Sequence, residues 1–429
     1  MAAKETIVVV VGAGASGEAG ISNTAELTKV AKRAMPTIVV PGVAYGPTAQ
    51  QNNRTILLAD VLDQALAADY GANCDFEILL HALEQIEAFV GPRYTGGEPN
   101  ANTPVLGSFA ELMRRYDCID DESMLHQARL NVLEAIHHRV GSDCDHARNA
   151  PRDRAAKDQL NRIFEKLAER YRVIVIDFNY DVVLDRLPSI QWNDGFTNVV
   201  GPGCLMFSPD DWRQQVDDSD AHLLMHLHGS ATFGYQPFGL PTHVSVRYAE
   251  PAKYDTISAA QASLKLRGMS GTIVGGNIED ASYIVSGVGK AGKVTYNARP
   301  YGYYFRTIMD FLTRTERLLI LGYSHRDYHV NTWINEYVGL RPNRRTAVVT
   351  HRTGDMVGDN TSLEYQALAR IAEQATWSRI ETFAYARRDD ERNAGAGSRF
   401  RVEGNFAIAP EGFVMEPDDE KALIGFITI

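Results

Sequence analysis

Short apolar runs predict the strands of this chain. The run Ile7 to Val11 is apolar and β-branched throughout, and Gly12-Ala13-Gly14 follows at once. Such a run is typical of a strand that is buried on both faces of a parallel sheet. Further runs of this kind are Thr37 to Val40, Arg172 to Ile176, His222 to Leu227, Arg317 to Leu321 and Thr346 to Val349. Together they predict the parallel sheet of an α/β fold.

Apolar residues at helical spacing fill much of the segment between the second and third runs. They predict helices over Asp75 to Val90, Ser108 to Tyr116, Glu122 to Val140 and Arg154 to Arg170. Another helix is expected over Glu18 to Lys32, after the first strand. Little between about residues 53 and 171 has the pattern of a strand. We therefore expect a helical subdomain inserted into the sheet.

The predicted fold is a Rossmann-like open parallel sheet with this helical insert. The sheet domain is expected to comprise residues 1–52 and 172–385, and the insert residues 53–171. The region Phe233 to Asn297 is Gly-rich and is expected to form loops with a short hairpin. Residues 386–429 form a C-terminal tail with strand-like pieces, expected to be a solvated terminus and, alternatively, an oligomer contact.

Composition narrows the classes of function. The 429 residues are 45% hydrophobic, enough for a substantial core, and the formal net charge is −11. A net negative charge argues against sequence-independent binding of nucleic acid. The sequence shows neither a signal peptide nor a run of the ~20 apolar residues that span a bilayer, so we expect a soluble, cytoplasmic protein. The four cysteines form no Cys-x-x-Cys pair, so we expect reduced thiols and no zinc ribbon.

A glycine-rich loop follows the first strand directly. Its residues are Gly12, Ala13, Gly14, Ala15 and Ser16. Glycines let a backbone turn sharply and approach a diphosphate, which free N–H groups at a helix N-terminus then hold. Dehydrogenases add an acidic residue about 20 positions later that grips the adenosine ribose. No such residue stands out here, so the loop is not of the ordinary dehydrogenase type.

A carboxamide and a carboxylate follow the third strand-like run, at Asn179 and Asp181. An asparagine side chain both donates and accepts hydrogen bonds, so Asn179 can orient a ribose hydroxyl or an attacking water. In the alternative interpretation, Asn179 or Asp181 only caps a helix over Val182 to Arg186. Both interpretations remain open at this point.

Two histidines end the next strand, and a glycine and a serine end the following one. Alternation along a strand places His226 and His228 on the same side. One of them is a candidate general base; the alternatives are a core histidine and a His-x-His metal site, for which no recognisable set of further ligands exists. Gly322 and Ser324 are candidates for binding ribose or phosphate, and Asp327 either joins them or caps the next helix.

Taken in this order, the four motifs resemble the sirtuin-like superfamily, and specifically its bacterial antiphage branch, over about residues 5 to 350. The resemblance implies that Asn179, Asp181 and His228 lie beside the nicotinamide ribose of NAD. It also implies that Gly12 to Ser16 hold the pyrophosphate, and that Gly322 and Ser324 face the ribose and phosphate. His226 matches no catalytic position and is expected to be structural.

Two departures from the protein-deacylating sirtuins bear on the activity. Those enzymes follow the glycine loop with Gly-Ile-Pro-Asp-Phe-Arg, where this chain has Gly20-Ile21-Ser22-Asn23-Thr24-Ala25, and they carry a four-cysteine zinc ribbon. The departures fit members that hydrolyse NAD to nicotinamide and ADP-ribose and so deplete it during phage infection. We therefore expect an NAD glycohydrolase with NAD as its substrate and no metal.

Three other functions remain open: an NAD-dependent protein deacylase, a non-catalytic NAD or ADP-ribose sensor that gates a partner, and a metal hydrolase built on His226 and His228. Because an unregulated NADase is toxic, an off-state is expected. The resemblance implies control by homo-oligomerisation or by a partner, either a HerA-type ATPase or a short Argonaute. The helical insert is expected to act as an assembly surface or as a lid.

Overall fold

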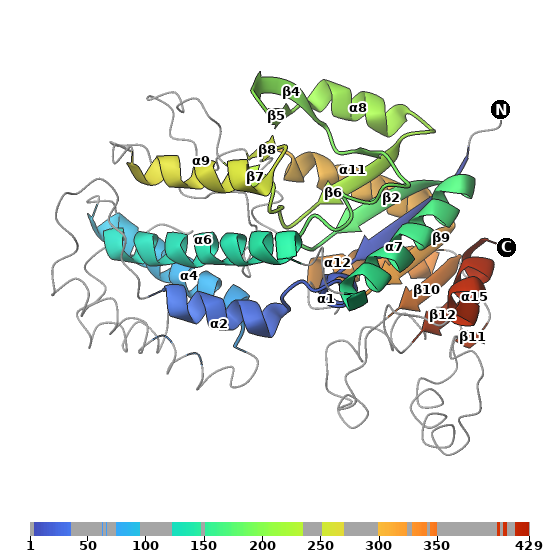
Figure 1. Ribbon diagram of the computed structural model, residues 1–429, viewed down its shortest axis with the longest axis horizontal. Coiled ribbons are helices and arrows are strands. Elements are labelled where there is room, and N and C mark those ends of the chain that lie inside the picture. Colours follow the sequence, from blue (N-terminus) through green and yellow to red (C-terminus); the bar gives the residue numbers. More distant parts are fainter. Residues whose placement is uncertain are drawn as a thin grey trace, which may run out of the picture.

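Figure 1 shows the computed structural model of the chain. The structure describes residues 4–35, 62, 66, 74–94, 122–146, 151–234, 251–269, 299–323, 328–340, 344–349, 401–403, 406–409 and 417–428. The strand expected over Thr37 to Val40 and the helix expected over Ser108 to Tyr116 lie outside these residues. Ser324 and Asp327 also lie outside them.

An eight-stranded sheet, counted over the described residues, runs through the centre of the structure (Figure 1). Its strand order is β11-β12-β10-β9-β1-β2-β6-β3, and all neighbouring strands pair in parallel except β11 and β12. The strands are β1 (Glu5–Val11), β2 (Tyr171–Asp177), β3 (Trp192–Asn193), β6 (His222–His226), β9 (Arg317–Leu321), β10 (Arg345–Val349), β11 (Arg401–Glu403) and β12 (Phe406–Ala409).

The order of the parallel strands is that of a Rossmann fold. If β1, β2, β6, β9, β10 and β12 are numbered along the chain, they lie in space as 3-2-1-4-5-6. This confirms the predicted α/β fold with a Rossmann-like parallel sheet. The order reverses between β1 and β9. In open α/β sheets, ligands bind outside the carboxyl ends of the strands at such a reversal.

The core is centred on β1, whose residues Ile7 to Val11 are at most 1% exposed. The strand pairs with β2 on one side and β9 on the other. Figure 1 shows α7 (Pro151–Arg170) and α15 (Pro417–Thr428) in front of the sheet, and α11 (Tyr301–Arg314) and α12 (Tyr328–Leu340) behind it. Because both faces are covered, the run needs no alternation of apolar and polar residues.

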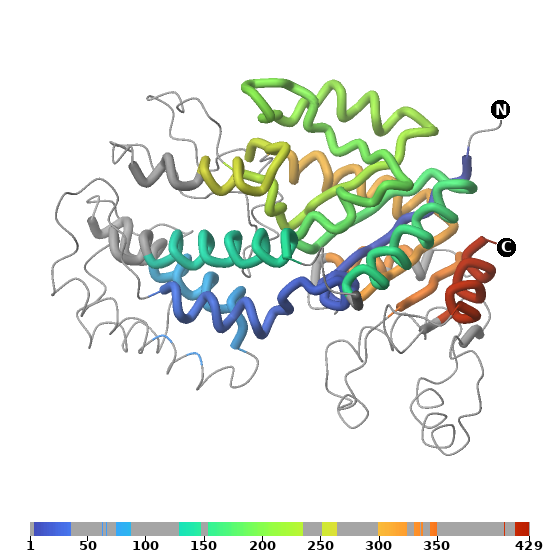
Figure 2. Tube along the Cα trace, in the orientation of Figure 1, coloured from blue at the N-terminus to red at the C-terminus, as the bar shows by residue number. Residues whose placement is uncertain are grey.

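Three helices pack together beside one end of the sheet: α2 (Thr24–Ala34), α4 (Phe76–Tyr94) and α6 (Glu122–His146). Figure 2 follows them as the blue and green tubes on the left of the view. The backbone N–H of Phe76 donates to Thr28 Oγ1 at 2.9 Å and ties α4 to α2. Helix α7 differs, because it packs on β2 as part of the sheet's own covering layer. The domain limits at residues 52, 171 and 385 stay a prediction.

The helix expected over Glu18 to Lys32 was placed too early. A short helix, α1 (Ala13–Gly17), follows β1, and α2 begins only at Thr24. Between them Gly20 has φ +88°, which interrupts the helical path. Asn23 then starts α2 with a capping box, in which Asn23 Oδ1 accepts from the N–H of Glu26 and Glu26 Oε2 accepts from that of Asn23, both at 3.0 Å.

A second, antiparallel sheet of four strands lies next to the first, again counted over the described residues. Its order is β4-β5-β8-β7, and α8 (Pro209–Asp217) and α9 (Ile257–Met269) follow β5 and β8 along the chain. The strands are β4 (Phe196–Gly201), β5 (Cys204–Phe207), β7 (Phe233–Gly234) and β8 (Ala252–Tyr254). A short hairpin was expected between Phe233 and Asn297; β7 and β8 pair in antiparallel fashion there, and the segment that connects them lies outside the described residues. Helix α9 was not expected there, because its alanines and serines give no clear apolar stripe.

The strand-like pieces of the C-terminal segment belong to the main sheet. β12 pairs in parallel with β10, and α15 packs against α7, β10 and β12. Leu423 and Ile427 of α15 are fully buried, and Arg162 of α7 pairs with Glu420 at 3.0 Å. These residues therefore complete the sheet, where a solvated terminus was expected. The sequence pattern indicated strands in this segment, but it did not indicate that β12 pairs with β10.

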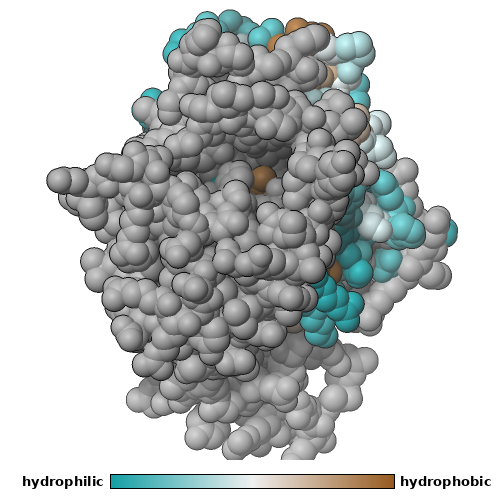
Figure 3. Space-filling view, turned by 90° about the vertical axis from the view of Figure 1, so that its left-hand side faces the viewer, coloured by the Kyte–Doolittle hydropathy of each residue, from teal (hydrophilic) through white to brown (hydrophobic). Residues whose placement is uncertain are grey.

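The coloured surface in Figure 3 is mainly hydrophilic, and hydrophobic residues show there as small separate spots. Among large hydrophobic side chains of the described residues, Val199 stands out as 72% exposed. No helix in the described part of the chain has the length and apolar character needed to cross a membrane.

We expect Leu423→Ala to destabilise the whole fold, because it leaves a cavity between α15 and the sheet. Truncation of a buried leucine costs about 2–5 kcal/mol. The free energy of unfolding, measured by chemical denaturation, tests this. Lys421→Ala, on the exposed side of the same helix, is the control and is expected to change it by less than about 0.5 kcal/mol. Equal stability of both variants would show that α15 is not part of the cooperative core.

Candidate functional site

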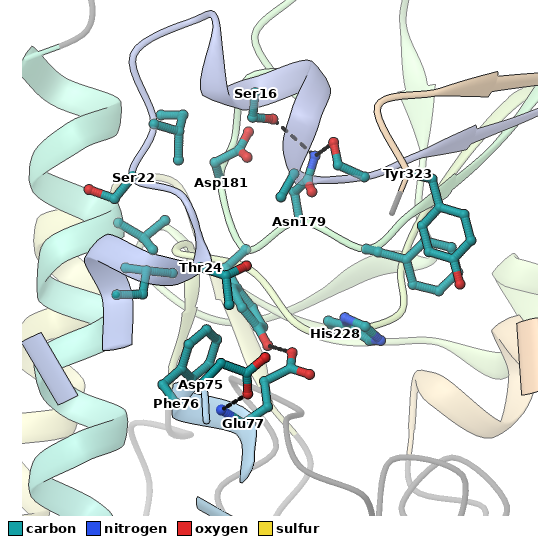
Figure 4. Close-up of a pocket in the computed structure, with 17 residues that line it drawn as sticks. Ser16, Ser22, Thr24, Asp75, Phe76, Glu77, Asn179, Asp181, His228 and Tyr323 are labelled. Carbon is teal, nitrogen blue, oxygen red and sulfur yellow. Dashed lines mark hydrogen bonds between the residues drawn. The ribbon is translucent and has the colours of Figure 1, made fainter. Parts of the chain in front are cut away.

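A cavity opens where four parallel strands end, and it is lined from both sides (Figure 4). One wall comes from the strand ends: Gly12, Ala13 and Ser16 after β1, Phe178 to Asp181 after β2, His228 after β6 and Tyr323 after β9. The space is about 90 Å³. This is below the ~300–1,000 Å³ of typical small-molecule sites.

The glycine loop lies directly against the end of β9. The N–H of Gly12 donates to Leu321 O at 2.9 Å, and that of Gly14 donates to Gly322 O at 2.8 Å. The N–H of Ala15 donates back to Gly12 O at 3.0 Å. Three of the amides expected to be free for a diphosphate therefore already bind backbone carbonyls. Gly12, Ala13 and Ser16 line the cavity, so ligand contact from this loop is expected from those residues.

Gly322 is needed for this close packing. It has φ +59°, and a Cβ atom there would lie 2.1 Å from the backbone nitrogen of Ala15. Only glycine fits both the left-handed conformation and the contact. Its expected contact with ribose or phosphate stays a prediction, as does that of Ser324, which lies outside the described residues.

Asn179 has one half of its amide fixed and the other half unpaired. Nδ2 donates to Gly12 O at 3.1 Å and to Ser16 Oγ at 2.9 Å, which fixes the orientation of the amide because a carbonyl only accepts. The side chain lines the cavity and is 5% exposed. Its Oδ1 is buried and has no hydrogen-bond partner among the described residues. Since a buried unpaired acceptor is costly, this atom is suited to receive a donor from a ligand or water.

Asp181 lies beside Asn179 and shares Ser16 with it (Figure 4). Burial raises the pKa of Asp181 to about 6, with help from the charge of Asp177, while hydrogen bonds from the Ser16 hydroxyl and the Val183 N–H oppose the shift. The carboxylate thus titrates close to neutral pH. The helix expected over Val182 to Arg186 is a turn instead, and Asp181 Oδ1 caps it by accepting from Val183 N at 2.9 Å. Asp181 therefore has a local structural role and also faces the cavity.

His228 reaches the cavity because β6 ends before it. The strand stops at His226, and Leu227 and His228 form a turn that Gly229, with φ +93°, completes. The imidazole of His228 packs edge-on against the ring of Phe178, with centroids 5.0 Å apart, and is 5% exposed. Figure 4 shows it across the cavity from the helical wall.

His226 does not share that environment, so the expectation that both histidines lie on the same side was wrong. The expectation assumed a strand that continues to His228, whereas the turn redirects the chain. Nδ1 of His226 lies 3.2 Å from Asp177 Oδ2, and Nε2 lies 2.9 Å from Asp185 Oδ2. His226 is fully buried and does not line the cavity. No group of three potential metal ligands occurs among the described residues.

The opposite wall of the cavity comes from the helices. Asp75, Phe76 and Glu77 at the start of α4 line it, together with residues of α2 and α6. Asp75 Oδ1 caps α4 by accepting from the N–H of Glu77 at 3.0 Å, and the Tyr180 hydroxyl donates to Glu77 Oε1 at 3.3 Å. Sequence reasoning missed these residues. An acid before an apolar helix signals a helix start, but nothing in the pattern places that start opposite Asn179.

Comparison with known families identifies one part of the chain. Residues 173–372 match a SIR2-like domain. The match includes Asn179, Asp181 and His228 but begins after the glycine loop. It supports the resemblance to the Sir2-type family and indicates an NAD-related, NAD-dependent activity. No curated protein matches the chain.

We expect Gly322→Ala to disrupt the contact between the glycine loop and β9. The added methyl group would meet backbone atoms of Gly14 and Ala15, and the positive φ would be strained. The melting temperature is expected to fall by several degrees, about 4 °C or more. Gly17→Ala is the matched control, because a Cβ atom there meets nothing within 4 Å. Tolerance of both substitutions would show that the contact is looser than described.

We expect the pH dependence of stability to reveal the buried carboxyl of Asp181. Its pKa is higher in the folded state than the ordinary 3.8, so its contribution to stability is complete below about pH 4 and is lost as the pH rises through about 6. Asp181→Asn removes this loss. Relative to the wild type, the variant should gain up to about 3 kcal/mol between pH 4 and 7. Urea denaturation across that range measures it.

Asp158→Asn, on the exposed surface of α7, controls for the loss of one carboxylate. If the two variants show parallel pH profiles, Asp181 does not titrate in this range.

Proposed function

We propose that the protein hydrolyses NAD at the nicotinamide–ribose bond and releases nicotinamide and ADP-ribose. The observation that carries the proposal is the buried, unpaired Oδ1 of Asn179 in a cavity that His228 also lines. This cavity lies at the strand ends of a Rossmann-like sheet, and both residues belong to the part of the chain that matches a SIR2-like domain.

The charges of the cavity suit the cleavage step. Asp75, Glu77 and Asp181 line the cavity, and none of its described lining residues is Lys or Arg. As the C1′–N1 bond breaks, its electron pair passes to the nicotinamide nitrogen and positive charge develops on the ribose. Carboxylates close to that charge stabilise it. With a pKa of about 6, Asp181 is mainly ionised above that pH.

Asn179 and His228 complete the hydrolysis. Asn179 Oδ1 accepts a hydrogen bond from the attacking water or from a ribose hydroxyl, and so orients it. The water oxygen forms a bond to C1′, and His228 accepts the proton and later returns it to solvent. General-base catalysis of this kind is worth about 10²–10⁴-fold in rate.

The biological setting proposed for this activity follows from the resemblance to antiphage sirtuin-like proteins. In this proposal the enzyme is an effector that depletes cellular NAD during infection. Its off-state depends on homo-oligomerisation or on a partner, either a HerA-type ATPase or a short Argonaute. The helical wall at Asp75 and Glu77 supports a role of the helices α2, α4 and α6 in closing the site.

We expect Asn179→Ala and His228→Ala each to lower NAD hydrolysis by at least about 100-fold, because each removes a group that acts on water or ribose. Chromatography of nicotinamide and ADP-ribose, with NAD as the only substrate, measures the activity. The matched controls are Asn198→Ala on β4 and His146→Ala on α6, both exposed, and they should keep full activity.

The same assay separates the alternatives. A deacylase releases nicotinamide only when an acyl-peptide is added, whereas a sensor binds NAD without turnover, also in the presence of candidate partners. Either result contradicts the proposal, as does full activity of the folded Asn179→Ala and His228→Ala variants.

A further inference from the structure

A row of buried and half-buried ionisable side chains leads from the backbone of Asn179 to the four-stranded sheet. We call it the charge chain; its members are Asp177, His226, Asp185, Lys253 and Asp194. His226 lies between Asp177 and Asp185, at 3.2 and 2.9 Å. Lys253 Nζ lies between Asp185 Oδ1 at 2.9 Å and Asp194 Oδ2 at 2.5 Å. Acidic and basic side chains alternate along the row.

The charge chain links the main sheet to the second sheet, and no strand pairing joins these two sheets. Asp177 ends β2 and His226 ends β6, both in the main sheet, while Lys253 lies on β8 of the second sheet. Asp194 follows β3, and the hydroxyl of Tyr304 on α11 donates to its backbone carbonyl at 2.6 Å. The row therefore crosses from one sheet to the other.

Asp177, the first member of the charge chain, forms a hydrogen bond with the backbone of Asn179. Asp177 Oδ1 accepts the N–H of Asn179 at 3.0 Å, while Oδ2 faces His226. The carbonyl of Asp177 accepts the N–H of Leu227 at 2.9 Å, next to His228. The position of Asp177 thus bears on both turns that carry the proposed catalytic residues.

His226 carries a positive charge in this arrangement. Burial alone would lower its pKa, but the carboxylates of Asp185 and Asp177 outweigh burial and raise that pKa to about 10. Nε2 of His226 hydrogen-bonds to Asp185 Oδ2, whereas Nδ1 lies close to Asp177 Oδ2 without hydrogen-bond geometry, so the protonated ring is held beside Asp177 by charge. Lys253 likewise stays charged, because Asp185 and Asp194 raise its pKa against the effect of burial.

Stabilisation of the fold does not by itself explain why these ionisable side chains are buried in a row. The side chains of Asp177 and His226 are at most 1% exposed, and those of Asp185, Lys253 and Asp194 at most 20%. Buried ion pairs often contribute no more than well-packed apolar residues of similar volume, yet breaking one is strongly unfavourable. Their best-attested use is to fix one arrangement of the chain among several.

We propose that the charge chain positions Asn179 for the reaction and couples its geometry to the second sheet. Asp177, His226, Asp185 and Lys253 are then positioning residues that act through the backbone of Asn179. The kinetic part of this inference rests on the proposed NAD hydrolysis. The structural part concerns the Asn179 backbone and stands on the contacts alone.

The test is Asp185→Asn in the full chain, a substitution of equal size that removes one carboxylate from His226. With one counter-charge lost, His226 becomes a weaker partner for Asp177, and the hydrogen bond from the Asn179 N–H weakens. We expect that amide to exchange with deuterium at least about tenfold faster. We also expect kcat for NAD to fall at least about tenfold, with KM changed less than about twofold.

Glu420→Gln is the control, because it makes the same chemical change in the Arg162–Glu420 ion pair of α7 and α15. It should change neither the amide exchange at Asn179 nor kcat. Unchanged exchange at Asn179 and unchanged kcat in Asp185→Asn would overturn the inference. If the wild type does not cleave NAD at all, the proposed function fails, while the exchange measurement still decides this inference.

A second pair of variants covers the case in which Asp185→Asn does not fold. Lys253→Arg keeps the charge that anchors Asp185, and Lys253→Gln removes it. If the charge of Lys253 positions Asn179, the arginine variant keeps slow amide exchange at Asn179 and a kcat within about threefold of the wild type. The glutamine variant shows faster exchange at Asn179 and a lower kcat. Equal behaviour of the two folded variants would show that the charge of Lys253 has no role in positioning.

Discussion

The contact between the glycine loop and the end of β9 leaves no room for a side chain, and the site depends on it. A Cβ atom at Gly12 would lie 2.6 Å from Tyr323 Cα, and one at Gly322 would lie 2.1 Å from Ala15 N. Two backbones can therefore pack directly at the reversal of strand order. The carbonyl of Gly12 accepts from both the Ala15 N–H and Asn179 Nδ2, so the loop that was expected to bind phosphate also fixes the amide.

Three polar residues in one short segment receive different environments from the fold. Asp177 faces His226 in the buried row, Asn179 presents an unpaired oxygen to the cavity, and Asp181 has its pKa raised to about 6 by burial. Their side chains are two residues apart, yet each meets different neighbours because the chain leaves β2 and turns immediately. One turn of the chain thus provides an oriented amide at Asn179, a contact with the basic His226 at Asp177, and a carboxyl with a pKa near neutral at Asp181.

The sequence predicted the strands that build the sheet and most of the residues at its edge. Short apolar runs marked β1, β2, β9 and β10 because burial on both faces removes any need for polar positions. Gly12, Asn179, Asp181 and His228 were chosen because each follows such a run, and the structure brings them to one cavity. The pairing of His226 with His228 failed because alternation applies only within a strand, and β6 ends at His226.

The amino-acid sequence by itself determined the fold class and the kinds of side chain at the strand ends, because both follow from local burial and turn chemistry. Only the tertiary structure decided which of those side chains meet. Asp75 and Glu77 arrive opposite Asn179 from about 100 positions earlier, and Lys253 reaches His226 through Asp185. Such contacts depend on how helices and sheets dock in space, which is a property of complementary surfaces and carries no periodic signal along the chain.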